Sequence, residues 1–469
     1  MPIDFKLKKT YLNFCIMIGV ILFDAAFLLA IQRSYVFLGL YIIANIVFMT
    51  IYCSKRKMID CVVFTILFML FYTWFIDIFI HYLGKKVILE AEFLYLVPLL
   101  LTCAKKRMKE TSAFLYFSVV YIVFNMFVAI VSGKVDVSNY FRFMVNIMTF
   151  VGFYYLFKVI EVEPKLFDLF KFLIACCSLI TVLQTVAGFN TDTRNAVFSV
   201  FGFGGYSIFI MLFLSFHISK YTLKQESFRT FALIIVFGTI LYICTESKAA
   251  LVLVFVDIMV ISAVQRGVSF RKILIVALGV ISLPIAYGLL LKFNPKFSYM
   301  TTFSTIIRYY TGNNNWRYEY GRFQAIANVF SDQDWFTRMF GVGFGSSTPL
   351  YTVLYNELGV DFSSPYYIKK YGYYYGYQHT SISTLLLDGG LILACVIVIM
   401  FVVKVVRTLK GIQKDSKNLT ESMRLGVLVY LIYYFTYANI LKDFRAMAVT
   451  AIVFSIKSLN VYTQKDEKT

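Results

Sequence analysis

Charged residues are scarce in this sequence. They make up 15% of its 469 residues, whereas 59% are hydrophobic, and the mean hydropathy is +0.73. Average globular proteins carry about 25% charged residues. The shortage excludes an ordinary soluble protein and predicts a chain for which the lipid bilayer is the solvent.

The sequence has few of the residues that bind metals or build disulfide frameworks. It contains three His and eight Cys, and no His, Cys and Asp residues stand at metal-ligand spacing. The Cys residues lie in or beside apolar runs, which argues against a disulfide framework. We therefore expect no metal and no other cofactor.

Acidic residues are fewer than basic ones, 26 against 45, which gives a formal net charge of +19. The Lys and Arg residues are scattered through short loops instead of forming one basic face, so nucleic acid is not an expected partner. The start MPIDFKLKK precedes an apolar run without a small-residue cleavage pattern. It predicts an uncleaved first membrane span.

Long apolar runs, in contrast, fill most of the chain. A helix needs about 20 apolar residues to cross the hydrocarbon core of a bilayer. The runs predict an all-α, polytopic transmembrane bundle of about fourteen spans. These are expected near residues 11–31, 35–53, 61–83, 87–104, 112–132, 143–160, 172–188, 196–218, 230–244, 249–264, 273–292, 381–405, 425–441 and 446–458.

The distribution of basic residues predicts the orientation of these spans. Most Lys and Arg residues fall in every second loop, as in Lys55-Arg56-Lys57 and the run 404–424. Because short cytoplasmic loops retain Lys and Arg, both termini should be cytoplasmic. The chain then divides into spans 1–11 (residues 1–292), a large outer loop (293–380), and spans 12–14 with a cytoplasmic tail (381–469).

The outer loop is too long for a simple hairpin. It contains the Tyr-rich stretch 371–377 and several basic residues. Within it, residues 319–330 place apolar side chains at near-helical spacing. This pattern predicts an amphipathic helix lying against the membrane.

His379 ends the outer loop and directly precedes an apolar run. A neutral imidazole at the membrane surface can accept a proton from an attacking hydroxyl group or orient it. A histidine with an interfacial position and no chemistry explains the same pattern. Both interpretations stay open on the residue alone.

Basic residues from separate outer segments form a second set of candidates. Arg317 and Arg322 diverge by roughly 140° on a helix, so they need not share a target. Arg194 and Lys248, the latter beside Ser247, lie in two other outer loops. Guanidinium and ammonium groups stabilise a pyrophosphate leaving group without metal, although contact with ordinary lipid headgroups explains them equally.

Two further patterns favour other interpretations. The segment 341–345 (GVGFG) resembles a phosphate loop, but it lacks a strand–loop–helix setting and predicts a tight turn against the membrane. Carboxylates inside spans often mark ion pathways and favour a transporter, unless helix packing or a water-filled cavity explains them. They are Asp24, Asp77, Glu90, Glu92 and Asp257.

Several motifs together resemble a known family. They are Arg194 before a span, the turn Thr245-Glu246-Ser247-Lys248, and then NNNWRYEYGRF, FGVGFG and QHTSISTLLLDGG in that order. Over roughly residues 190–395 this pattern is similar to the bacterial O-antigen polymerase and O-antigen ligase family. Lys248 departs from the Arg usual in that family's turn, and the segment SDQDWFTRM stretches the spacing to FGVGFG.

The resemblance implies a metal-independent glycosyltransferase of the bacterial inner membrane that uses a polyprenyl-pyrophosphate-linked glycan donor. His379 would activate the acceptor, and Arg317 or Arg322, with Arg194, Ser247 and Lys248, would bind the donor pyrophosphate. Expected partners are lipid-linked donor and acceptor oligosaccharides, membrane lipids, a chain-length regulator and a flippase.

Three functions remain after these considerations. A polymerase would join repeat units into O-antigen or capsular polysaccharide at the outer face of the membrane. A ligase would transfer the finished glycan to lipid A core. A lipid-linked oligosaccharide flippase has many spans and internal charges but no need for a long outer loop that ends in His379. The sequence therefore favours the polymerase, followed by the ligase.

Overall fold

The computed structural model describes the central and C-terminal parts of the chain. The described residues are 113–133, 135, 137–160, 162, 165–188, 203–245, 248–266, 311, 322–331, 333–346, 380–457 and 459, with isolated positions between 43 and 99 and between 270 and 292.

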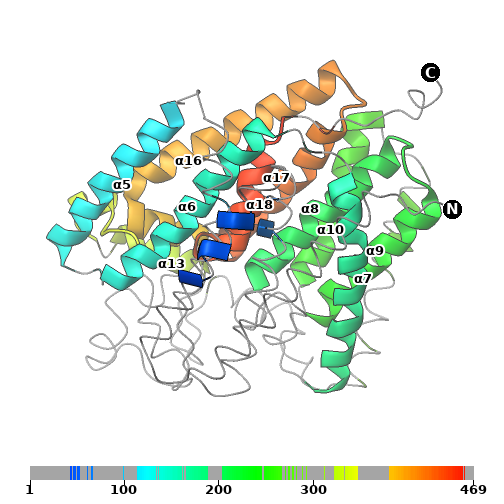
Figure 1. Ribbon diagram of the computed structural model, residues 1–469, viewed down its shortest axis with the longest axis horizontal. Coiled ribbons are helices and arrows are strands. Elements are labelled where there is room, and N and C mark those ends of the chain that lie inside the picture. Colours follow the sequence, from blue (N-terminus) through cyan, green and yellow to red (C-terminus); the bar gives the residue numbers. More distant parts are fainter. Residues whose placement is uncertain are drawn as a thin grey trace.

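These residues are helical, in agreement with the predicted all-α class (Figure 1). Within the described part, the one β-type contact is an isolated parallel bridge between Val162 and Leu459. The helices are α5 (Ala113–Ser132), α6 (Val137–Val159), α7 (Lys165–Val186), α8 (Phe203–Thr222), α9 (Phe228–Cys244), α10 (Lys248–Arg266), α13 (Arg322–Ser331), α14 (Trp335–Phe340), α16 (Ser381–Lys414), α17 (Leu419–Tyr437), η5 (Ile440–Lys442) and α18 (Phe444–Ser455).

The helices α5 to α10 and α16 to α18 coincide with predicted spans, with ends shifted by up to several residues. In the described part of the chain, α16 alone is both long and apolar enough to cross a membrane by length and composition. The predicted span 11–31 lies outside the described residues. The runs 35–53, 61–83, 87–104 and 273–292 are described only at isolated positions.

Helix α8 lies at the centre of the bundle. Every residue from Ser207 to Ser219 is buried, and α8 packs against α9, α10, α17 and α18. Helix α6 packs along α18, and α16 packs along α17. Leu, Ile, Phe and Tyr side chains fill these interfaces, so the main core is apolar and aromatic.

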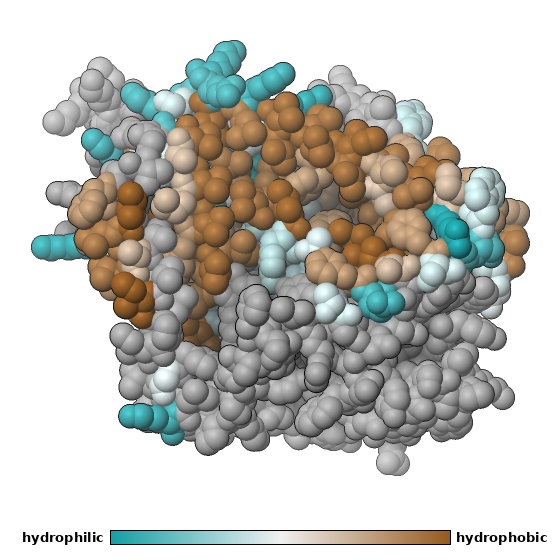
Figure 2. All heavy atoms as spheres, turned by 180° about the vertical axis from the view of Figure 1, so that it is seen from behind, coloured by the Kyte–Doolittle hydropathy of each residue, from teal (hydrophilic) through white to brown (hydrophobic). Residues whose placement is uncertain are grey.

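The surface of the described helices is also apolar. Figure 2 shows a broad hydrophobic face with hydrophilic side chains mainly around its margins. Large exposed hydrophobic residues recur on α5, such as Val120 and Ile130, and on α16, such as Val398 and Ile399. Exposed apolar surface on this scale is unusual for a soluble monomer.

The bundle has two polar ends. Helices α5 and α17 end, and α16 and α18 begin, at one end of the bundle. Residues 341–346 lie there too, and we call it the glycine-loop end. At the opposite end α8 terminates and α9 begins; we call this the His217 end. Helices α16, α17 and α18 run between the two.

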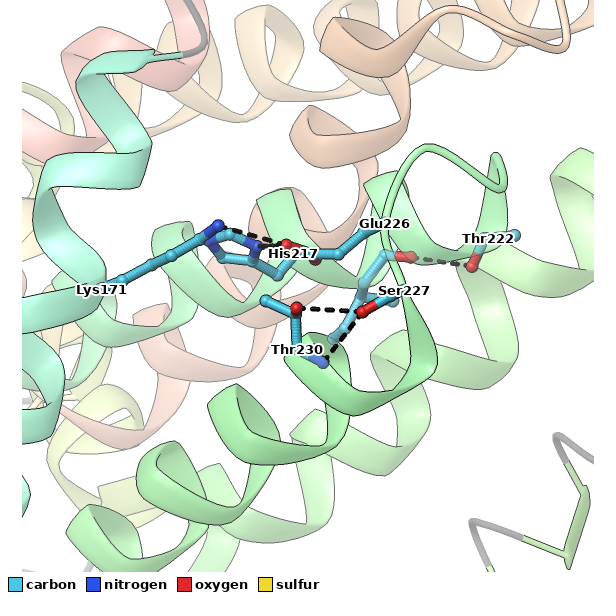
Figure 3. Close-up of polar contacts among 7 residues, drawn as sticks. Lys171, His217, Thr222, Glu226, Ser227 and Thr230 are labelled. Carbon is cyan, nitrogen blue, oxygen red and sulfur yellow. Dashed lines mark hydrogen bonds and ion pairs between the residues drawn. The ribbon is translucent and has the colours of Figure 1, made fainter. Parts of the chain in front are cut away.

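The His217 end contains an ion-pair cluster (Figure 3). His217 Nδ1 lies 2.8 Å from Glu226 Oε2, and Lys171 Nζ lies 3.3 Å from Glu226 Oε1. Burial raises the pKa of Glu226, but the hydrogen bond with His217 and the positive charges of Lys171 and Lys220 more than offset it and lower the pKa overall. Nearby, the Ser227 hydroxyl accepts from the backbone N–H of Thr230 and caps α9.

Candidate functional site

The predicted amphipathic helix at 319–330 is present as α13, which begins at Arg322 and ends at Ser331. Ala325 and Val329 are buried, whereas Phe323 is 51% exposed. Helix α13 packs against α16. This packing brings the first residue of α13 to the glycine-loop end.

Arg322 is held against the end of α17. Its side chain is largely buried, its Nε donates a hydrogen bond to the Tyr437 carbonyl oxygen, and its guanidinium carbon lies 4.5 Å from the centre of the Tyr437 ring. A planar guanidinium suits this combination of hydrogen bonding and stacking, which lysine cannot reproduce.

The beginning of α16 is attached to the same place. Thr380 caps the helix in a reciprocal arrangement with Ser383. The backbone N–H and the hydroxyl of Ser381 both donate to the Ala438 carbonyl oxygen at 2.9 Å, and the Ser381 hydroxyl accepts from the Ile440 N–H at 2.9 Å. The first turn of α16 therefore lies against the residues that follow α17.

The predicted tight turn at 341–345 is confirmed, and it is built against a break in α16. Gly341 and Gly390 have positive φ angles of 81° and 73°. A Cβ at Gly341 would lie 2.5 Å from the Asp388 carbonyl oxygen, and a Cβ at Gly390 would collide with the Met339 carbonyl oxygen. Glycine is therefore required on both sides of this contact, because the φ angles are positive and because a Cβ atom would collide with a carbonyl oxygen.

The Asp388 carboxylate joins the glycine loop to α16. It is fully buried and accepts from the Gly345 N–H at 2.9 Å and from the Ser346 hydroxyl at 2.6 Å. Val342 N–H and Gly343 N–H donate to the carbonyl oxygens of Leu387 and Asp388 at 2.8 and 3.1 Å. The buried N–H groups of this irregular loop therefore donate to backbone carbonyl oxygens and to the Asp388 carboxylate, as buried polar groups generally need a hydrogen-bond partner.

Helix α5 supplies polar side chains to this junction. Asn125 donates to the Asp388 carbonyl oxygen at 2.9 Å and accepts from the Phe344 N–H at 2.7 Å. The Tyr121 hydroxyl donates to the Gly389 carbonyl oxygen. Two helices distant in sequence, α5 and α16, therefore hold the glycine loop between them.

Two further basic residues lie where α18 begins. Lys442 is half-buried; burial lowers the pKa of its ammonium group, whereas the charge of Asp388 acts in the opposite direction. Arg445 makes two contacts with the Asp443 carboxylate, at 3.0 and 3.1 Å. The glycine-loop end therefore gathers Arg322, Lys442 and Arg445 with two carboxylates.

A large apolar groove adjoins this polar end. It encloses about 1080 Å³, part of it open to the surroundings, between α5, α6, α16 and α18. Its lining is almost entirely apolar and includes Phe143, Phe344, Ile397 and Met447, with Asp388 as the one charged residue among the described lining residues.

Most predicted site residues lie outside the described part of the chain. Arg194, Ser247, Arg317 and His379 belong to this group, as does the Tyr-rich stretch. Lys248 is the first residue of α10, but its side chain is not described. Arg322 is thus the one predicted site residue whose contacts the structure gives.

The sequence argument missed Asp388, Asn125 and Lys442. A polar residue inside an apolar run was a usable signal for Asn125 and Asp388, because such residues need partners. Lys442 lies in a short loop between two apolar runs. Nothing in the sequence around it distinguishes it from the other basic residues scattered through the outer loops.

Comparison with known proteins identifies no relative. No protein-family model matches the chain, and no curated protein matches it. Function therefore has to be argued from the motifs and the geometry.

Proposed function

We propose that the chain is a polytopic inner-membrane protein of about fourteen spans with cytoplasmic termini. The contacts support this topology. Ser132, at the end of α5, donates to the Val342 carbonyl oxygen at 2.9 Å, and Ser381 contacts Ala438. The three loops involved are those that the positive-inside rule assigns to the outer face. The glycine-loop end is then the outer end of the bundle.

The proposed activity is polymerisation of polyprenyl-pyrophosphate-linked repeat units into O-antigen or capsular polysaccharide at this outer end. One observation carries the proposal beyond the motif resemblance. Arg322 contacts Tyr437, and Ser381, two residues after His379, contacts the adjacent Ala438. Two motifs distant in sequence, one with the arginine pair and one with the histidine, therefore converge on the end of α17.

In the proposed reaction, a hydroxyl oxygen of the acceptor sugar attacks the anomeric carbon of the donor. His379 takes the hydroxyl proton, the bond between the anomeric carbon and the pyrophosphate oxygen breaks, and polyprenyl pyrophosphate leaves. Basic side chains stabilise the charge on the leaving oxygen. The donor linkage supplies the energy, so no nucleotide is needed, and basic side chains take the place of a metal ion at the pyrophosphate.

The contacts of Arg322 suggest different roles for the two arginines. Hydrogen bonding and stacking on Tyr437 make Arg322 a positioning residue for the loop, which leaves Arg317, with Arg194, Ser247 and Lys248, to bind pyrophosphate. Arg322→Lys should then fail to restore activity lost in Arg322→Ala. A wild-type rate in Arg322→Lys would instead show that this position needs only a positive charge and not a planar guanidinium group.

The apolar groove fits the donor's hydrocarbon chain in this scheme. A polyprenyl chain is apolar along its length, and the lining of the groove includes Asp388 of the polar end where the pyrophosphate would bind. Replacing Ile397 and Met400 with Trp would fill the groove and raise the KM for the lipid-linked donor more than it lowers kcat.

The proposal is tested with His379→Ala in a strain that lacks its own copy of the protein, after its membrane level has been confirmed. Wild type should give a ladder of surface glycan chain lengths, and the variant should give core carrying a single repeat unit. His217→Ala is the matched control, since His217 lies at the opposite end and should leave the ladder intact.

Two other results would identify the alternatives. If core carries no repeat unit while long lipid-linked glycan accumulates, the protein is the ligase. An unchanged ladder would remove His379 from the mechanism and favour a flippase or another transporter.

A further inference from the structure

Asp257, at the centre of the bundle, has no part in the proposed glycosyl transfer. It lies on α10, is fully buried, and faces both α8 and α17. The Ser215 hydroxyl of α8 donates to its Oδ2 at 2.6 Å. On α17, Gly426 leaves room for the carboxyl group, because a Cβ at that position would collide with Asp257 Oδ1.

No basic group neutralises this carboxyl group in the described structure. The helices that pack against α10 carry these described charged side chains: His217 and Lys220 on α8, Arg229 on α9, Asp388, Lys404, Arg407, Lys410 and Lys414 on α16, and Glu421 and Arg424 on α17. His217 pairs with Glu226, and Arg424 pairs with Glu421 and donates to the carbonyl oxygens of Val453 and Ile456. Lys220 lies over the ring of Phe216. An isolated charge is so costly in apolar surroundings that a buried carboxylate takes up a proton.

Further polar side chains continue from Asp257 toward the His217 end. Ser219 follows Ser215 by one helical turn on α8, and Gln265 follows Asp257 by about two turns on α10. The Gln265 amide donates to the Ser422 hydroxyl near the beginning of α17. These side chains therefore share one seam between α8, α10 and α17.

The seam contains buried oxygen atoms without partners among the described residues. They are Asp257 Oδ1, Ser219 Oγ and Gln265 Oε1. Such atoms are rare in folded proteins and call for an explanation by water or an ion. Their order leads from the centre of the bundle to Gln265, which is 7% exposed.

We propose that Asp257 is a binding site for one proton, reached through this seam from the His217 end of the bundle. A hydronium ion in the seam transfers its proton to Oδ1 and becomes water, and the neutral carboxyl group then donates a hydrogen bond back to the seam. The site gives α8, α10 and α17 a packing that depends on protonation, separate from the chemistry at the glycine-loop end.

Infrared difference spectroscopy of the full-length protein in lipid nanodiscs tests this proposal. Wild type minus Asp257→Asn should show the carbonyl stretch of a protonated carboxylic acid at neutral pH, and this band should shift when the buffer is changed to D₂O. Asp415→Asn, which removes an exposed carboxylate between α16 and α17, should remove no such band.

Ser215→Ala provides the second variant. It removes one hydrogen bond, so the band should move in frequency and remain present, which assigns it to Asp257 even if Asp257→Asn does not accumulate. Absence of a protonated-acid band, insensitivity to D₂O, or a band abolished by Na⁺ at constant pH would each overturn the proposal, the last by assigning the oxygens to a metal cation.

Discussion

The two ends of the bundle are polar in different ways. At the His217 end, the polar groups are ion pairs and a helix cap formed around the short connection between α8 and α9. At the glycine-loop end, Asn125 of α5 binds backbone more than two hundred positions away in sequence, and Asp388 of α16 binds the Gly345 N–H of the irregular loop. The contacts at the His217 end stabilise a short helix connection, whereas those at the glycine-loop end hold irregular backbone in place between α5 and α16.

This difference suggests that only the glycine-loop end is built for chemistry. Glycines with positive φ angles and a break inside α16 shape this end in a way that a simple helix connection does not need. Such features persist where the surrounding structure holds them, which is common at functional sites. Substitutions at the glycine-loop end should therefore cost more stability than substitutions at the His217 end.

Asp388→Ala should destabilise the protein by about 4 kcal/mol, because it leaves the buried Gly345 N–H and Ser346 hydroxyl without the carboxylate that accepts from both. Thermal unfolding of the purified protein in detergent micelles measures this loss. Asp388→Asn should cost less, since an amide oxygen still accepts one hydrogen bond. Equal stability of all three proteins would contradict the role given to Asp388.

Gly390→Ala should destabilise by about 3 kcal/mol, because it combines a positive φ with a collision against Met339. Gly133→Ala is the matched control, since Gly133 has φ of 62° but no atom within 4 Å of the added Cβ. The control should lose about 1 kcal/mol from conformational strain alone. A similar loss in both variants would show that the contact between the glycine loop and α16 is not tight.

Glu226→Gln should destabilise by about 1 kcal/mol at neutral pH. Because the folded-state pKa of Glu226 is lowered, its contribution is present above the ordinary value of about 4.3 and disappears as the pH falls through the lowered pKa. Melting temperatures of wild type and variant should therefore differ at neutral pH and converge in acid. A gap that widens in acid would reverse the assigned sign.

Lys171→Met should have the smallest effect, at most about 0.5 kcal/mol, because the lysine side chain is 32% exposed and its ion pair is screened by water and salt. The loss should shrink further in high salt. A salt-independent loss of more than about 1 kcal/mol would mean that Lys171 contributes by packing instead of charge.

Local sequence patterns predicted much of this structure. Apolar runs located α5 to α10 and α16 to α18, near-helical spacing located α13, and glycines located the turn at 341–345. Helix ends were less predictable: α16 continues to Lys414 because its last turns retain helix-forming residues after the apolar run.

The junction could not be predicted in the same way. The contacts of Asp388 with Gly345 and of Asn125 with Phe344 depend on which helices pack together, and no local pattern contains that information. Arg322 was singled out for its charge, yet its described partners are a carbonyl oxygen and an aromatic ring supplied by α17. Positions far apart in sequence determine what each polar residue does.

Reconstitution of the purified protein with lipid-linked oligosaccharide repeat units tests the proposed activity most directly. Wild type should release polyprenyl pyrophosphate and lengthen the lipid-linked glycan in the presence of a metal chelator, and His379→Ala should do neither. Full turnover by His379→Ala, or movement of the glycan across the membrane without a new glycosidic bond, would contradict the assignment of a polymerase at the glycine-loop end.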